Sequence, residues 1–128
     1  MTAPTVLLVE ADVLIRSPLA DYLRECGYRV LEAGDTAEAR QLLRKPDGDV
    51  EVLLIEAQGQ GESGFAFAAW TREHHPQTDV ILTGALEHAT RKAADLCEEG
   101  PELRKPYDHR LVLDQIKRLI AARHRRGR

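Results

Sequence analysis

Short apolar runs rich in β-branched residues alternate along this 128-residue chain with longer amphipathic stretches. A parallel strand covered on both faces is typically a nearly continuous apolar run, whereas an amphipathic helix repeats apolar residues three and four positions apart. We predict strands at five segments: 5–9, 28–33, 50–55, 79–83 and, with the feeblest pattern, 102–103. Five such units joined by short loops predict an α/β fold, with one parallel sheet and helices on both of its faces.

Amphipathic stretches between and after these runs predict five helices, at residues 15–26, 35–45, 65–75, 87–96 and 108–122. Two aspartates stand where a side chain can cap the first free backbone N–H groups of a helix. Asp12 is the expected N-cap of the first helix, and Asp35 that of the second, with Glu38 as its capping-box partner.

Composition excludes several classes of protein. The chain is 43% hydrophobic, which is too apolar for a disordered segment, and no apolar run approaches the roughly 20 residues of a membrane span. No basic region precedes Glu10, so we expect no signal peptide. Two cysteines are too few for a disulfide framework, and Cys26 and Cys97 are therefore predicted to be buried free thiols of a cytoplasmic protein.

Charge is distributed unevenly along the chain. Residues 117–128 hold six Lys or Arg residues and no acid. Because the whole chain has a net charge of −3, residues 1–116 carry a net charge of −9. A basic end of this kind can contact nucleic acid or anionic lipid. The interpretation that we favour is a solvated helix end, since Lys and Arg suit the C-terminus of a helix.

Polar residues follow four of the five predicted strands. Glu10 and Asp12 follow the first strand, and Glu56, Thr83 and Lys105 follow the third, fourth and fifth. The carboxyl ends of parallel strands meet at one edge of the sheet, so these groups should lie together. Carboxylates beside a hydroxyl and an ammonium group suit a pocket for Mg²⁺ and a phosphoryl group, although each acid alone also fits a turn or a helix cap. No glycine-rich nucleotide loop follows any strand, which argues against dinucleotide or P-loop chemistry.

Four strings in this order resemble the receiver domain of bacterial two-component response regulators: VLLVEADVLIR, the span from VEVLLIE to Gly64, VILTG and LRKPYD. The resemblance covers residues 4–122 and leaves 123–128 as a short basic tail with no output domain. It implies a flavodoxin-like (CheY-like), doubly wound sheet of five parallel strands in the order 2-1-3-4-5. It also implies that an aspartate after the third strand accepts phosphate from a histidine kinase, with Mg²⁺ bound beside it.

The residues at the implied site depart from the family pattern. Glu10 matches the first of two adjacent acids after the first strand, but Ala11 stands where the second, a direct metal ligand, is expected. Glu56 replaces the phosphoacceptor aspartate. Thr83 and Lys105 match the switch hydroxyl and the phosphate-binding lysine.

Two further departures concern the loop and the switch. Gly59 and Gln60 replace a Met-Pro pair in the loop after the third strand, and Glu102 replaces the aromatic switch residue. In-line phosphoryl transfer depends on accurate positioning and charge neutralisation, so the replacements at the acceptor and metal positions should both weaken it. Glu56 could imitate a phosphorylated aspartate or could simply pair with Lys105, and both interpretations stay open.

Our leading hypothesis is a single-domain, phosphorylation-independent signalling protein that is not an enzyme. It would act through protein–protein contacts with a histidine kinase or another two-component protein, or as a homodimer. We expect no cofactor beyond weakly held Mg²⁺, with Glu10 and Glu56 as its ligands if it binds. The first alternative is a working phosphoacceptor in which Glu10, Asp12 and Glu56 hold Mg²⁺. The second is nucleic-acid contact through the basic tail, which the acidic remainder of the chain disfavours.

Overall fold

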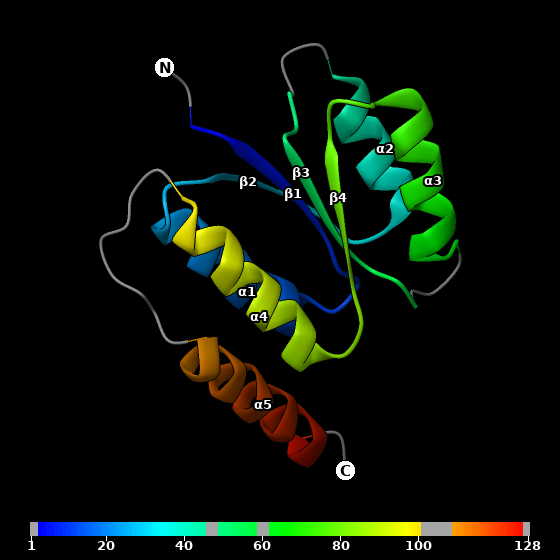
Figure 1. The fold of residues 1–128 in the computed structure, drawn as a ribbon. Helices are drawn as coiled ribbons and strands as arrows, with labels where there is room; N and C mark the ends of the chain where they lie inside the picture. Colours follow the sequence, from blue (N-terminus) through cyan, green and yellow to red (C-terminus); the bar gives the residue numbers. More distant parts are fainter. Residues whose placement is uncertain (1–2, 46–48, 59–61, 101–108, 127–128) are drawn as a thin grey trace.

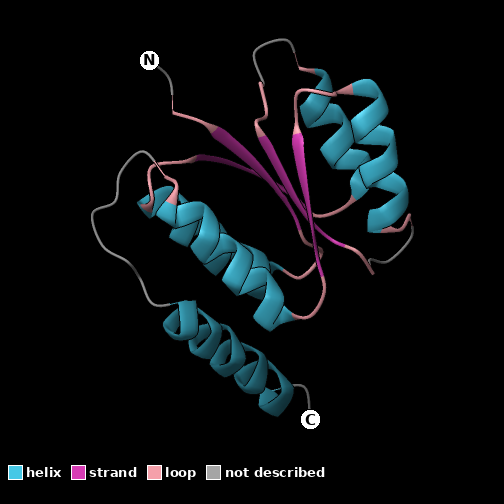
Figure 2. Cartoon of the chain, viewed as in Figure 1, coloured by secondary structure: helices cyan, strands magenta, loops and turns pink. Residues whose placement is uncertain are grey.

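Parallel strands form a single sheet in the computed structural model, which describes residues 3–45, 49–58, 62–100 and 109–126 (Figures 1 and 2). Within these residues the sheet has four strands in the order β2-β1-β3-β4. The strands are β1 (Thr5–Val9), β2 (Arg29–Ala33), β3 (Val52–Glu56) and β4 (Asp79–Thr83). They confirm the predicted α/β class and the order of the first four strands. The predicted fifth strand at 102–103 lies outside the described residues.

The register of the sheet places the strand ends side by side. β1 is central and buried along its whole length, as its continuous apolar sequence predicts. Val9 at its end pairs with Ala33 of β2 and Ile55 of β3, and Glu56 pairs with Thr83 at the end of β4. The residues that follow these strands therefore meet at one edge of the sheet.

Five helices are described: α1 (Val13–Glu25), α2 (Thr36–Arg44), α3 (Gly64–His74), α4 (Leu86–Glu98) and α5 (His109–Arg126). The two predicted caps are confirmed. Asp12 accepts a hydrogen bond from the backbone N–H of Leu14, and Asp35 accepts one from that of Glu38. The carboxylate of Glu38 lies 3.5 Å from the backbone nitrogen of Gly34, rather than on the N-cap residue as in a capping box.

Helices cover both faces of the sheet, as predicted. α2 and α3 lie on one face and α1 and α4 on the other, while α5 packs against α1 and α4 farther from the sheet (Figure 1). One apolar core lies between the sheet and α2 and α3 and includes Leu7, Leu53 and Phe67. The other joins β1 to α1 and α4 and takes in Val112 and Ile116 of α5.

The C-terminal helix is longer than predicted. α5 continues to Arg126, four residues past the expected end at 122, so residues 123–126 belong to the helix rather than to a separate tail. No helix among the residues that the structure describes is both long enough and apolar enough to cross a membrane.

The expectation of free thiols is wrong, because Cys26 and Cys97 form a disulfide bond. Cys26 caps the C-terminal end of α1, and Cys97 lies in the last turn of α4. The packing of these two helix ends brings the Cα atoms to 5.1 Å, within the range that a disulfide spans. A count of cysteines carries no information about this packing, so the cysteines no longer support the expected cytoplasmic location.

Candidate functional site

An acidic cavity of about 290 Å³ opens at the carboxyl ends of β1 and β3. Its lining includes Glu10, Asp12 and Glu56, which confirms that the acids after the first and third strands converge. Two further acids, Asp35 and Glu62, line the same cavity from the start of α2 and the approach to α3. The site is therefore rich in carboxylates, and the groups that hold each carboxylate decide what the site can bind.

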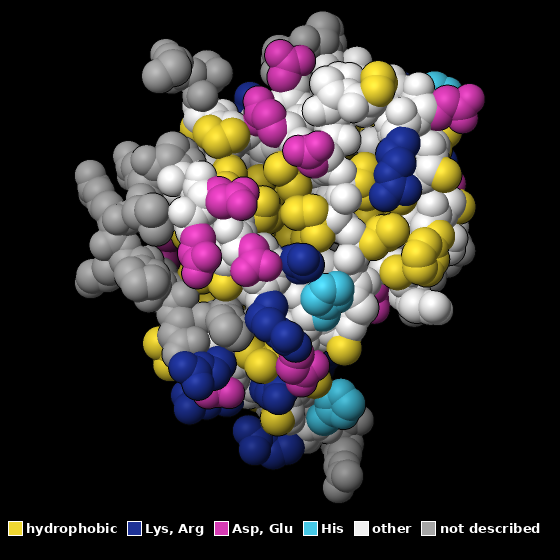
Figure 3. Space-filling model, in the orientation of Figure 1, with side chains coloured by type: hydrophobic (Ala, Val, Ile, Leu, Met, Phe, Trp, Pro, Cys, Tyr) yellow, Lys and Arg dark blue, Asp and Glu magenta, His cyan; other side chains and the backbone are white. Residues whose placement is uncertain are grey.

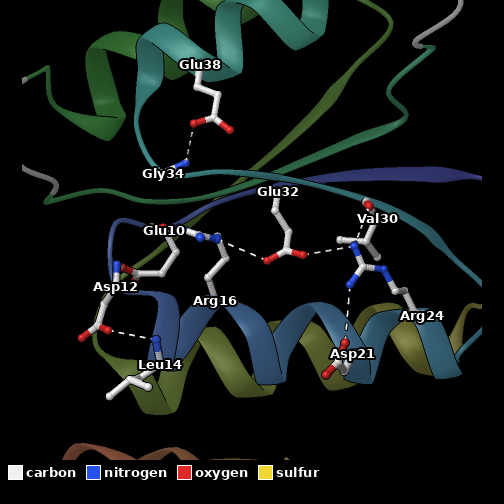
Figure 4. A network of polar contacts seen from close by, with 10 residues as sticks. All are labelled: Glu10, Asp12, Leu14, Arg16, Asp21, Arg24, Val30, Glu32, Gly34 and Glu38. Atoms are coloured by element: carbon white, nitrogen blue, oxygen red, sulfur yellow. Dashed lines mark hydrogen bonds and ion pairs between the residues drawn. The ribbon is translucent and has the colours of Figure 1, made fainter. Parts of the chain in front are cut away.

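Glu10 is the most enclosed of the acids that follow the strands. Its carboxylate accepts a hydrogen bond from the backbone N–H of Asp12, at 2.8 Å. Burial raises the pKa of Glu10 and outweighs this hydrogen bond, which lowers it. The nearby charge of Glu56 raises the pKa further. Arg16 donates to the carbonyl oxygen of Glu10 at 2.8 Å and pairs with Glu32 at 3.2 Å, which ties the end of β1 to α1 and β2 (Figure 4).

Asp12 is engaged by two partners. One carboxylate oxygen caps α1 by accepting from the N–H of Leu14 at 3.0 Å. The guanidinium of Arg123 donates to both carboxylate oxygens, at 3.0 and 2.7 Å. This contact is the first cause of the lowered pKa of Asp12. A residue of α5 thus supplies the cation at this edge of the cavity, which the sequence analysis did not foresee.

Glu56 is the last residue of β3 and lies beside Thr83 in the sheet register. Burial raises the pKa of its carboxyl group. Among the residues that the structure describes, the Glu56 side chain has no hydrogen-bond or ion-pair partner. The acid at the acceptor position is therefore partly desolvated, and no described cation lies against it.

The remaining predicted site residues are only partly placed. The Thr83 hydroxyl is buried and points to the carbonyl oxygen of Ile55, at 3.5 Å, the outer limit of a hydrogen bond. Lys105 and Glu102 lie outside the described residues, as do Gly59 and Gln60. The interpretation that Glu56 pairs with Lys105 therefore stays a prediction.

The other two acids of the lining each have a partner, although the buried Oε1 atom of Glu62 accepts no hydrogen bond from the residues that the structure describes. Asp35 caps α2, and Glu62 pairs with Arg40 of α2 at 2.7 Å. The guanidinium of Arg40 lies 5.0 and 4.8 Å from the ring centres of Phe67 and Trp70. No sequence pattern indicated that Arg40 pairs with Glu62, because these residues belong to different βα units.

The carboxylates present do not fit the Mg²⁺ site that the resemblance implies. Ala11 lines the cavity with a methyl group where a ligand is expected, and Asp12 is bound to Arg123. Within the described part of the chain, no group of three or more His, Cys, Asp or Glu side chains could hold a metal ion. Hard cations need several oxygen ligands at once, so convergence on one cavity is insufficient.

Known proteins with similar sequences and folds are response regulators. The transcriptional regulatory protein GltR of Pseudomonas aeruginosa is 29% identical over 119 residues, which cover 91% of this chain and 48% of GltR. The chain thus spans about half the length of the curated relatives it matches. A response regulator receiver domain protein from Clostridium thermocellum has the same fold, with a TM-score of 0.61 at 17% identity over 93% of this chain and 98% of that one.

A further solved structure contains the histidine kinase ThkA in complex with the response regulator protein TrrA. It matches with a TM-score of 0.57 and 26% identity, over 64% of this chain and 69% of that chain. The family model of the response regulator receiver domain matches residues 6–117. This chain therefore belongs to the response regulator receiver domain family.

Proposed function

We propose that this receiver domain acts in two-component signalling through protein–protein contacts and does not accept a phosphoryl group on Glu56. The observation that carries the proposal is the pair of residues at the cavity. A glutamate stands at the acceptor position, and Ala11 stands where a metal-binding carboxylate is expected. Both departures act on the same chemical step.

The longer side chain of Glu56 weakens the positioning of a nucleophile. Glutamate has one more methylene than aspartate, which moves its carboxylate outward by roughly 1.5 Å along an extended side chain. A misplacement of about 1 Å can cost on the order of a hundredfold in rate. An acceptor at the end of β3 therefore loses efficiency even where the fold is intact.

Charge neutralisation is weakened as well. Phosphoryl transfer in this setting needs a cation against the transferred group, and a cation needs carboxylates that are free to bind it. Ala11 supplies no carboxylate and Asp12 is paired with Arg123, so the cavity offers Glu10 and Glu56 at the ends of β1 and β3. We infer that Mg²⁺ binds weakly or not at all.

A permanent acid at position 56 also suggests a single signalling state. Glu56 carries its charge without a kinase, and Glu102 replaces the aromatic side chain that would move between two positions. Moving a charged side chain into an apolar slot costs several kcal/mol, so the usual switch is incomplete. Ligands can shift an equilibrium only where two states exist.

The partner is proposed to be another two-component protein, in keeping with the complex of ThkA with TrrA. α4 and α5 offer a contact surface, since they pack together and are joined by an ion pair of Lys117 with Glu87 at 3.4 Å. Leu111 and Leu119 of α5 are exposed on its outer side. Apolar side chains of this kind favour a protein partner.

Nucleic-acid contact is the weaker candidate. Lys and Arg side chains gather over α5 in Figure 3, as the sequence predicts. Arg123, however, is paired with Asp12, and the neighbouring surface in the same view carries several acids. A short basic stretch beside acids provides a weak electrostatic attraction for phosphates.

Titration calorimetry with Mg²⁺ tests the proposal at the step that phosphoryl acceptance requires. We expect the wild-type protein to show no saturation below about 1 mM Mg²⁺, because the site lacks a carboxylate. The matched variant Ala11→Asp restores that ligand and should bind at least about tenfold more tightly. Saturation of the wild type well below 1 mM would contradict the proposal and favour the working phosphoacceptor.

A further inference from the structure

The disulfide between Cys26 and Cys97 fixes one end of α4. It joins the C-terminal cap of α1 to the last turn of α4 across 71 residues of sequence. Both residues are almost fully buried, with 4% and 6% of their surface exposed. They belong to the same apolar core as the inner side of α5.

Close packing surrounds this bond. The hydroxyl of Tyr28 donates to the carbonyl oxygen of Leu96, one residue before Cys97. A Cβ atom on Gly100 would lie 2.5 Å from the carbonyl oxygen of Cys26, so the chain leaving α4 passes directly against the end of α1. The last turn of α4 is therefore held by a covalent bond, by a buried hydrogen bond and by close backbone packing.

The opposite end of α4 has no covalent bond to another element, and His88 in its first turn accepts an exposed hydrogen bond from the backbone N–H of Gly84 at 2.9 Å. Its N-cap residue is Ala85, which provides no side-chain hydrogen bond to the first turn. The ion pair of Glu87 with Lys117 is about half exposed on both sides, and exposed pairs of this kind contribute little. Loss of the disulfide should therefore loosen α4, and with it α5, before it affects α2 and α3 on the other face of the sheet.

We propose that Cys26–Cys97 is a redox-sensitive clamp, opened by thiol–disulfide exchange with a small thiol of the glutathione class. A thiolate attacks one sulfur, forms a mixed disulfide and releases the other cysteine as a thiolate. A second small thiolate then attacks the sulfur of the small molecule in the mixed disulfide, which forms the small-molecule disulfide and releases the second cysteine thiolate. One protein disulfide and two small thiols thus become two protein thiols and one small disulfide, with no other oxidant or reductant.

Burial of the sulfur atoms makes the exchange depend on motion. A thiolate can reach either sulfur only after the last turn of α4 has moved away from α1. At low thiol concentration the rate of reduction should rise with the thiol, and at high concentration it should level off at the rate of opening. The rate of reduction at high thiol concentration would therefore report how fast the last turn of α4 moves away from α1. This inference does not depend on whether Glu56 accepts phosphate.

Hydrogen exchange measured by mass spectrometry tests the proposal, with reduced glutathione as the probe. Cysteines are counted by maleimide labelling after denaturation, and two labels mark the reduced protein. Among amides that exchange by local opening, we expect those of α4 and α5 to exchange about tenfold or more faster in the reduced protein than in the oxidised protein, with those of α2 and α3 unchanged. The double variant Cys26→Ala/Cys97→Ala should match the reduced wild type and should ignore glutathione.

Three results would overturn the clamp. The first is equal exchange of α4 in the oxidised and reduced forms. The second is equal acceleration of the locally opening amides of α2 and α3, because the bond would then restrain local motion on both faces of the sheet rather than at one end of α4. The third is two reactive thiols in protein equilibrated with oxidised glutathione, since the bond would then not form.

Discussion

Gly64→Ala should destabilise the protein through a backbone clash beneath the acidic cavity. Gly64 is the first residue of α3 and donates its N–H to the carbonyl oxygen of Ala57 at 3.0 Å. A Cβ atom at this position would lie 2.1 Å from the carbonyl oxygen of Glu56 and 2.8 Å from the Cα atom of Ala57. Relaxed contacts between heavy atoms are about 3.5 Å, so the start of α3 must move by roughly 1.4 Å.

The expected cost follows from what surrounds the new methyl group. Its nearest neighbours are backbone atoms of Glu56 and Ala57, which cannot rotate away as a side chain can. Overpacking of this kind costs about 1–3 kcal/mol, and the better helix propensity of alanine returns at most about 1 kcal/mol. A contact of 2.1 Å with backbone belongs at the upper end of that cost, so we expect the free energy of unfolding to fall by about 2 kcal/mol.

Urea unfolding followed by Trp70 fluorescence measures this loss, because Trp70 is the only tryptophan and stacks on Phe67 at 5.5 Å. Gly34→Ala is the matched control. Its Cβ would lie 3.5 Å from a flexible nitrogen of Arg16, so the stability should change by less than about 0.5 kcal/mol. Equal effects of the two substitutions, or no loss for Gly64→Ala, would refute the reasoning.

Three further predictions concern the disulfide, the buried acid and the helix contact. Reduction of the Cys26–Cys97 bond, which closes a loop of 71 residues, should lower the free energy of unfolding by about 4 kcal/mol, and an unchanged urea midpoint would argue against the bond's role. Glu56→Gln should raise the stability at neutral pH but not below pH 4.5, because burial raises the pKa of Glu56 above 4.5 and protonation therefore favours the folded state. The wild type should thus lose stability relative to this variant as the pH rises from 4.5 through the folded pKa, and parallel stability–pH curves would contradict this sign. Arg123→Gln should raise the pKa of Asp12 toward its usual value, as NMR titration of the Asp12 carboxyl would report, whereas an unchanged titration would show that the contact is not maintained.

Local chemistry explains what the sequence predicted correctly. The four described strands were found because a strand buried on both faces needs an apolar residue at nearly every position, as β1 has. Asp12 and Asp35 were found as caps because an N-cap contacts a backbone group only two or three residues away. Glu10, Asp12 and Glu56 were placed together because parallel strands end at one edge of the sheet.

The features that the sequence did not predict join distant parts of the chain. The Cys26–Cys97 bond depends on the packing of α1 against α4, and the contact of Arg123 with Asp12 joins residues 111 apart. Neither arrangement follows from the spacing of residues, because periodicity identifies the apolar side of a helix and not the element that covers it. For the same reason, the sequence did not predict which charged side chains surround Glu56.

We propose that this receiver domain does not take a phosphoryl group on Glu56. Intact-mass spectrometry after incubation with Mg²⁺ and acetyl phosphate tests it directly, beside the double variant Ala11→Asp/Glu56→Asp that restores both missing carboxylates. We predict no added mass on the wild type and the mass of one hydroxylamine-sensitive phosphoryl group on the double variant. A hydroxylamine-sensitive phosphoryl group on Glu56 of the wild type would show that the domain is a working phosphoacceptor.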